Sequence, residues 1–292
     1  TRTISSAASD VYKRQIVPDS SLIELIEKLV FSNRRLLNLL MVNGELSQIG
    51  DNDSGRLFYF YHDEDDPLKM DWLINLIDHF FNFENKNSIE VPNLKNDPID
   101  LTNFSKVDHP LIKIFQNDFN LYTFPDFGIF IWRNNDGSEY FSVRCGQIGQ
   151  NGVGGHAHYD QLSIECFTEG KWIARDPGTG TYTDDIKTRN EFRSMKFHWG
   201  PNADIKFPKE SEFDCFKLNY MEDGKLLFLD KNNFLGSAVF NGNKIYRKIV
   251  IENGNILISD FSNDKNLNPY ENWGELNEGV KFKFSKGYKR IN

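Results

Sequence analysis

Two of the six histidines in this chain, His156 and His158, stand two residues apart in the stretch GGHAHYDQLSIECF. Residues i and i+2 of a β-strand point to the same face, so a strand here would project both imidazoles to one side. Asp176 follows in ARDPGTG, and His198 follows in NEFRSMKFHWG. Imidazoles and a carboxylate that converge on one point can bind zinc through three protein ligands and leave a fourth position open.

A hairpin would bring Asp176 close to the histidines. QLSIECF and KWIARDPG have the pattern of two strands joined by Thr168-Glu169-Gly170, which would place them side by side. A histidine pair of this kind can also simply satisfy the polar groups of a sheet. The added carboxylate and the third histidine favour the metal site.

The chain after about residue 120 has a period of two, which indicates β-strands. FGIFIWR and EYFSVRCG flank NNDGS, a hairpin signal. Further strands are predicted in FDCFKLNY, KLLFLDK, GSAVFN, KIYRKIVIEN and NILISDF, with turns at Asp223-Gly224, Asn241-Gly242 and Asn253-Gly254. So many short strands with glycine turns predict an antiparallel β-sandwich.

The chain before residue 116 is mainly helical in pattern. Apolar residues recur at i, i+3 and i+4 over 19–42 and again over 67–81, and a shorter helical or irregular piece is predicted near 109–115. The sequence therefore predicts an α+β multidomain chain, with a partial α-helical domain over 16–115 and a β-sandwich over 116–292. Residues 1–15 lack periodicity, and we interpret them as a non-native scar.

The composition restricts the classes of protein to consider. The chain has 292 residues, a formal net charge of −8 and 14% aromatic residues. The negative charge argues against a nucleic-acid binder, and no apolar stretch reaches membrane-spanning length. Abundant aromatic rings suit sheet cores and also clefts in which flat rings cover the faces of sugars.

Several stretches resemble a known family. RCGQIGQNGVGGHAHYDQLSIECF, RDPGTGTY and RNEFRSMKFH resemble the C-terminal region of the heparinase II/III-like polysaccharide lyases, and GDNDSGRLF resembles a segment near the end of that family's helical domain. The resemblance spans roughly residues 20–290 and is most specific over 144–198. It implies the C-terminal part of an (α/α) toroid followed by an antiparallel β-sandwich. It also implies β-elimination of uronic-acid-containing polysaccharides and one Zn²⁺ in the sandwich.

The resemblance assigns roles to individual residues. His158, Asp176 and His198 match the zinc ligands, and His156 matches a histidine that faces the substrate cleft. Tyr182 lies near a cleft tyrosine that follows the family's Asp-Pro-Gly turn. In β-elimination a base removes the proton next to the uronate carboxylate and an acid protonates the leaving oxygen. We assign these catalytic roles to His156 and Tyr182.

Five further residues are assigned to substrate binding. They are Arg144, Arg193, Asp53, Arg56 and Tyr159. The two arginines of the sandwich can neutralise uronate carboxylates, although buried structural salt bridges explain them equally well. Asp53 and Arg56 either line the cleft or belong to a capped, salt-bridged turn, and Asp51 is assigned to that turn alone.

The sequence also departs from the family pattern. The family's principal catalytic tyrosine and its partner lie on toroid helices upstream of GDNDSGR, and no matching segment is found here, so we expect a fragment with little lyase turnover of its own. Trp199-Gly200 stands where the family often has Asn-Thr. Two other functions stay open: a non-catalytic carbohydrate-binding or surface-polysaccharide assembly protein, and a zinc-dependent hydrolase with Asp160 as base.

Overall fold

The structure is a computed structural model, and it contains two compact units. It describes residues 20–52, 66, 68–80, 94–95, 99–205, 214–218, 221–263, 267–271, 273 and 284–286. One unit comprises residues 1–40 and 70–86, and the other comprises 41–69 and 87–292. The first is helical and the second is built on β-sheets, so residues 41–69 and 87–115 group with the strands.

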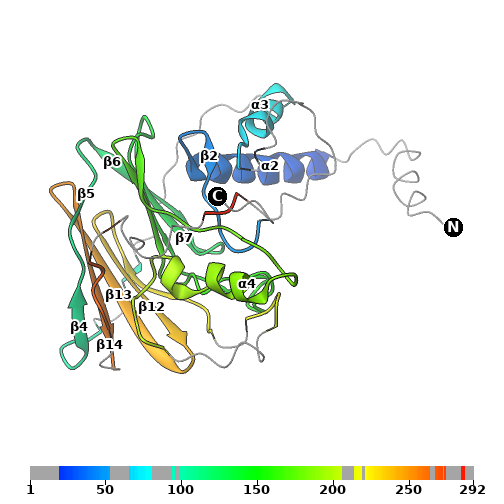
Figure 1. The fold of residues 1–292 in the computed structure, drawn as a ribbon. Helices are drawn as coiled ribbons and strands as arrows, with labels where there is room; N and C mark the ends of the chain where they lie inside the picture. Colours follow the sequence, from blue (N-terminus) through cyan, green and yellow to red (C-terminus); the bar gives the residue numbers. More distant parts are fainter. Residues whose placement is uncertain are drawn as a thin grey trace. The chain divides into compact units, whose positions relative to one another are not determined.

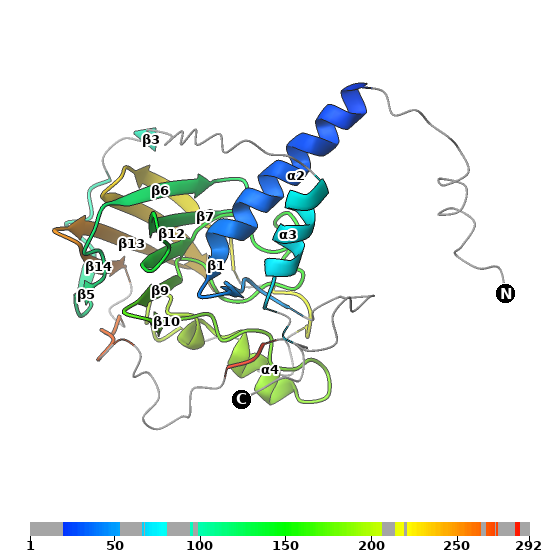
Figure 2. The same ribbon diagram turned by 90° about the horizontal axis from the view of Figure 1, so that it is seen from above.

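The helical unit contains α2 (Ser20–Leu40) and α3 (Asp71–Phe80), which lie beside each other (Figure 2). Both helices were predicted, the second with an earlier start. Asp66 explains the later start, because its side chain accepts the N–H of Leu68 at 3.0 Å and its carbonyl accepts that of Lys69 at 3.2 Å, which forms a turn. No helix among the described residues combines the length and the apolar character needed to cross a bilayer.

The first sheet is antiparallel and has the strand order β10-β9-β8-β7-β6. Its strands are β6 (Phe119–Phe124), β7 (Ile129–Asn134), β8 (Tyr140–Arg144), β9 (Ile164–Thr168) and β10 (Lys171–Ala174). Glu169 and Gly170 both have positive φ, 51° and 73°, as a two-residue hairpin turn requires. The predicted hairpin that leads to Asp176 is confirmed.

The second sheet is also antiparallel, with the order β3-β11-β12-β13-β14-β4 and with β5 paired to β14. Its strands are β3 (Leu94–Lys95), β4 (Ser105–Asp108), β5 (Ile112–Lys113), β11 (Lys225–Leu229), β12 (Asn233–Phe240), β13 (Asn243–Glu252) and β14 (Asn255–Ser262). The predicted turns Asn241-Gly242 and Asn253-Gly254 are confirmed, and all four residues have positive φ.

Secondary-structure predictions are wrong for part of 109–115 and for the described part of FDCFKLNY. Part of the segment 109–115 is the strand β5, because pairing with β14 overrides its local pattern. The described part of FDCFKLNY, residues 214–218, contains only an isolated bridge from Lys217 to Gly155. Asp214 accepts the backbone N–H groups of Phe216 and Lys217 at 2.8 and 3.2 Å, and this turn competes with strand pairing.

The two sheets pack face to face and enclose the hydrophobic core (Figure 1). Phe130 and Trp132 of β7 point inward from the first sheet, and Phe234 of β12 and Ile249 of β13 point inward from the second. The ring centroids of Phe130 and Phe234 are 5.7 Å apart. The predicted antiparallel sandwich is thereby confirmed.

A buried ion pair crosses the second sheet. Arg247 of β13 donates two hydrogen bonds of 2.7 Å to the carboxylate of Asp260 on β14, and both side chains are excluded from solvent. The same guanidinium donates to the carbonyls of Leu162 and Trp199 at 2.7 Å each. Arg247 therefore holds two loops of the β unit as well as its partner strand.

Replacing Arg247 with methionine should lower the free energy of unfolding by about 3–5 kcal/mol, because the buried carboxylate of Asp260 loses its guanidinium partner and keeps the contact with His109 Nε2 at 2.8 Å. Urea denaturation followed by tryptophan fluorescence measures this. Lys106→Met is the matched control, since its partner Asp108 and Lys106 itself have side chains 62% and 50% exposed. That exposed pair should contribute about 0–1 kcal/mol. Equal losses of unfolding free energy in both variants would contradict the stabilising role of the buried Arg247–Asp260 pair.

Candidate metal centre

The histidine pair lies in a loop, so the prediction that His156 and His158 share a regular strand is wrong. His156 has a φ of 54°, in the left-handed region that strands do not use. Its N–H donates to the carbonyl of Phe216 at 2.7 Å, and its own carbonyl accepts the N–H of Asp51 at 3.0 Å. Bonds to two different segments replace a strand ladder at this position.

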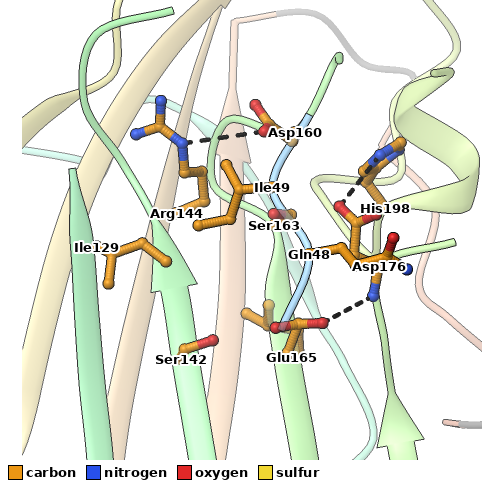
Figure 3. Close-up of a pocket in the computed structure, with 11 residues that line it drawn as sticks. Gln48, Ile49, Ile129, Ser142, Arg144, Asp160, Ser163, Glu165, Asp176 and His198 are labelled. Carbon is orange, nitrogen blue, oxygen red and sulfur yellow. Dashed lines mark hydrogen bonds and ion pairs between the residues drawn. The ribbon is translucent and has the colours of Figure 1, made fainter. Parts of the chain in front are cut away.

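The structure nevertheless brings the three predicted ligands together. The ligand atoms of His158, Asp176 and His198 lie within 4.8 Å of one another, and all three residues are buried. His158 Nδ1 lies 3.0 Å from His198 Nε2, and His198 Nε2 lies 3.4 Å from an oxygen of Asp176 (Figure 3 shows this second contact). Asp176 lies two residues after the end of β10, and His198 follows the short 3₁₀ helix η1 (Met195–Phe197).

The hydrogen bonds on the outer ring nitrogens fit a cation at this point. His198 Nδ1 lies 2.8 Å from the carbonyl of Ser194, which only accepts, so Nδ1 carries the proton and Nε2 carries a lone pair. His158 Nε2 lies 2.9 Å from Asp51 Oδ1, so its proton is on Nε2 and its Nδ1 carries a lone pair. Two lone pairs that face each other repel unless a positive charge lies between them.

Arg189 offers a competing contact that must be weighed. Its Nη1 lies 3.2 Å from His158 Nε2 and could donate to it, which would reverse the tautomer of that ring. The guanidinium, however, is already engaged with both oxygens of Asp51. A lone pair on His158 Nε2 would also face a carboxylate oxygen at 2.9 Å. We therefore assign the proton to Nε2.

The environment keeps both imidazoles neutral. Burial lowers the pKa of His158 to about 4, and burial lowers the pKa of His198 as well. Neutral imidazoles are the form that binds a metal ion. Burial raises the pKa of Asp176 well above its usual range, and a bound cation would favour its ionised form. The donor set of two neutral imidazoles and one carboxylate matches zinc.

Asp51 is the site residue that sequence reasoning assigned only to a turn. It follows a two-stranded ribbon, β1 (Met41–Val42) and β2 (Glu45–Leu46), and its side chain is 2% exposed. Its carboxylate is within hydrogen-bonding distance of His156, His158 and Arg189. Burial alone would raise the pKa of Asp51, but the hydrogen bonds and charges of His158 and Arg189 outweigh it and lower that pKa. The GDND motif contains Asp51, but the sequence did not indicate which residues would contact its carboxylate.

A small cavity of about 10 Å³ adjoins the predicted ligands Asp176 and His198 (Figure 3). Ser142 of β8, Ser163 of the loop before β9 and Glu165 of β9 line it. Glu165 accepts the backbone N–H of Asp176 at 3.0 Å, and burial raises the pKa of Glu165 to about 8. Glu165 thus positions the backbone of a ligand residue from within the first sheet.

The two predicted catalytic residues lie next to each other. His156 and Tyr182 have ring centroids 6.5 Å apart in an edge-to-face arrangement, and Phe216 packs against both rings. The guanidinium carbon of Arg189 lies 5.2 Å from the centroid of the Tyr182 ring. The side chain of His156 is 46% exposed, so this group of rings reaches the surface beside the buried predicted ligands.

Of the residues assigned to substrate binding, those that the structure describes do not share the half-exposed position of His156. Arg144, Tyr159 and Arg193 are buried. Arg144 donates to the carbonyls of Phe127 and Gly128 at 3.2 and 3.0 Å, and Arg193 donates to the carbonyl of Asp214 at 2.7 Å. These contacts favour the structural alternative that the sequence left open for both arginines. Asp53 and Arg56, like the predicted scar at 1–15, lie outside the described residues.

Comparison with known proteins finds a match to one sequence family. Residues 118–198 match the sequence family described as "Heparinase II/III-like, C-terminal". The predicted resemblance to the heparinase II/III-like family is confirmed. The matched segment runs from the residue before β6 to the ligand His198, and it contains every predicted metal ligand. No curated protein matches the chain.

Solved structures of three proteins are similar to this chain at low sequence identity. A heparinase III has 13% identity and a TM-score of 0.47, with 84% of this chain and 35% of that chain covered. A heparan sulfate lyase from Pedobacter heparinus has 14% identity, a TM-score of 0.46 and coverages of 87% and 34%. A heparinase III gene product with methylated lysines has 12% identity, a TM-score of 0.45 and coverages of 82% and 32%. This chain spans about a third of the length of each.

The Asp-Pro-Gly turn of the heparinase II/III-like segment is held by residues far along the chain. Gly178 has a φ of 81°, and its N–H donates to Asp176 at 2.7 Å. Ser285 donates its N–H to the carbonyl of Pro177 at 2.8 Å, and its own carbonyl accepts a side-chain N–H of Gln48 at 2.9 Å. The turn that carries a ligand is therefore packed between two distant segments.

Replacing Gly178 with alanine should destabilise the protein more than Gly170→Ala. Both glycines have positive φ, so each alanine costs about 1–2 kcal/mol of backbone strain. A methyl group at Gly178 would also collide with the carbonyl oxygen of Ser285, which adds about 1–3 kcal/mol, whereas the space around Gly170 is open. Thermal and urea unfolding of both variants measure the difference, and equal effects would show that the turn is not tightly packed.

Proposed function

We propose that this chain binds one zinc ion through His158, Asp176 and His198 and forms the metal-bearing part of a polysaccharide lyase. The proposal rests on the distance of 3.0 Å between His158 Nδ1 and His198 Nε2, which lie beside a buried carboxylate. We assign a lone pair to each of these two nitrogens. Zinc is the ion that two imidazoles and one carboxylate with an open position suit best. Bound there, it would supply a positive charge near the half-exposed ring of His156 and the neighbouring ring of Tyr182.

The proposed reaction is β-elimination in a uronic-acid-containing glycan. A base must remove the proton next to the uronate carboxylate, and an acid must protonate the leaving glycosidic oxygen. His156 and Tyr182 are the residues of this chain that we assign to contact the sugar, because the ring of His156 is half-exposed and the ring of Tyr182 packs against it. The imidazole offers an acceptor for the proton, and the phenol offers a donor for the leaving oxygen.

The similar structures support the class of substrate. Their names describe heparinases and a heparan sulfate lyase, so we propose a glycosaminoglycan as the first polymer to test. We further infer that α2 and α3 are the end of an (α/α) toroid, whose other helices would supply the remaining catalytic groups. The hydrolase alternative loses support, because Asp160, its proposed base, is buried 3.9 Å from Arg144.

Protein purified without chelator should contain about one zinc ion per chain. His198→Ala should weaken zinc affinity by at least about 100-fold, because even loss of a residue that only orients a ligand costs 10–100-fold. Chelator competition and elemental analysis measure both values. His79→Ala on the helical unit is the control and should bind zinc like the wild type. Zinc content near zero in the wild type would overturn the metal assignment.

In the full-length protein, His156→Ala should slow β-elimination by about 10²–10⁴-fold, because a positioned acid or base commonly contributes that much. The ultraviolet absorbance of the unsaturated uronate product, formed from heparan sulfate or alginate, gives the rate. Zinc content should stay at the wild-type level, since His156 is not one of the proposed ligands. Absence of product from every uronate polymer, with zinc bound, would favour the non-catalytic carbohydrate-binding alternative.

A further inference from the structure

The carboxylate of Asp51 contacts two histidines, one of which is half-exposed and one of which is buried. Asp51 Oδ1 lies 2.9 Å from Nε2 of the buried His158, and Asp51 Oδ2 lies 3.0 Å from Nδ1 of the half-exposed His156. The carboxylate itself is almost fully buried, with 2% of the side chain exposed. The two ring contacts therefore occupy both oxygens of a group that water hardly reaches.

Arg189 keeps this carboxylate ionised and in place. Its guanidinium donates to both oxygens of Asp51, with Nη2 at 2.8 Å from Oδ2, and the Arg189 side chain is fully buried. Its Nε donates to the carbonyl of Cys215 at 3.1 Å, which fixes the guanidinium from the other side. An ionised carboxylate can only accept hydrogen bonds, so each histidine must donate to it.

The tautomers of both rings follow from these contacts. His158 donates from Nε2, which leaves its Nδ1 lone pair pointing at His198 Nε2. His156 donates from Nδ1, which leaves the lone pair on its Nε2. The backbone of His156 is held as well, since its N–H donates to Phe216 and its carbonyl accepts from Asp51. The ring of His156 is thus fixed by its side chain and by its backbone.

We propose that Asp51 is a positioning residue that sets the tautomers of His156 and His158 at the same time. One buried carboxylate, held by Arg189, would orient a metal ligand on one side and leave Nε2 of the half-exposed His156 as a proton acceptor on the other. The role at His158 rests on the proposed zinc site. The role at His156 does not, because it depends only on hydrogen bonds within this chain.

The test combines a spectroscopic readout with a binding readout. Histidine ¹⁵N NMR at about pH 8, where histidine is neutral, distinguishes a ring protonated on Nδ1 from one protonated on Nε2. The His156 signals are assigned by their loss in His156→Ala. We expect metal-free wild type to hold His156 mainly as the Nδ1–H tautomer. A wild-type ring protonated mainly on Nε2 would overturn the proposal without the need for any variant.

Asp51→Asn then removes one acceptor oxygen and puts an N–H donor in its place. It cannot accept from both rings as the carboxylate does, so we expect His156 to shift towards the Nε2–H tautomer and the zinc Kd to rise about 10–100-fold. Asp185→Asn makes the same chemical change at the N-cap of α4 (Ile186–Phe192), the helix that carries Arg189, and should change neither readout. Asp51→Ala removes both acceptor oxygens and is the second variant if Asp51→Asn does not fold.

The outcomes separate this inference from the proposed function. If zinc does not bind but metal-free His156 is protonated on Nδ1 and Asp51→Asn shifts it, the metal assignment fails and the role of Asp51 at His156 stands. If zinc binds and folded Asp51→Asn or Asp51→Ala leaves both the His156 tautomer and the zinc Kd unchanged, Asp51 is not a positioning residue. The zinc site would then stand without it.

Discussion

The burial of the Asp51 carboxylate is the constraint on which the rest of the site depends. An ionised carboxylate removed from water costs several kcal/mol unless charge and hydrogen bonds compensate for it. Here the compensation comes from Arg189 and from two imidazoles, which belong to segments 105 to 138 residues further along the chain. Because each of these groups is needed, the ribbon before Asp51, the histidine loop and α4 must come together as one assembly.

A second buried ion pair constrains the opposite side of the same loops. Arg247, paired with Asp260, donates to the carbonyls of Leu162 and Trp199. Leu162 and Trp199 have left-handed backbones, with φ of 62° and 53°, and Trp199 directly follows the proposed ligand His198. Backbones in this region need outside support to persist. The sandwich therefore contributes to the site through fixed carbonyl positions as well as through the strands that lead to it.

Local patterns made much of the β-unit predictable. Asn-Gly turns, alternating strands and the β9–β10 hairpin depend on residues that are adjacent in the sequence. The sandwich could therefore be predicted from the sequence. The family resemblance indicated His158, Asp176 and His198, which the fold brings close together. Asp51 and Arg189 could not be found in this way, since a carboxylate 138 residues from its guanidinium leaves no local periodicity. The histidine loop was taken for a strand because spacing alone does not reveal a left-handed residue such as His156.

The division of the chain into units has a consequence for how such proteins can evolve. Residues 41–69 belong to the β unit, but α3 and its neighbours, residues 70–86, separate them from the rest of that unit. Recombination at the predicted domain boundary near residue 116 would separate three residues from their partners. Asp51 contacts His156, Ser47 contacts Glu165, and Gln48 contacts Ser285. Exchange of the helical unit between lineages would preserve the site only if the crossovers spared residues 41–52. The short ribbon and the sheets must therefore be inherited together, although helical sequence lies between them.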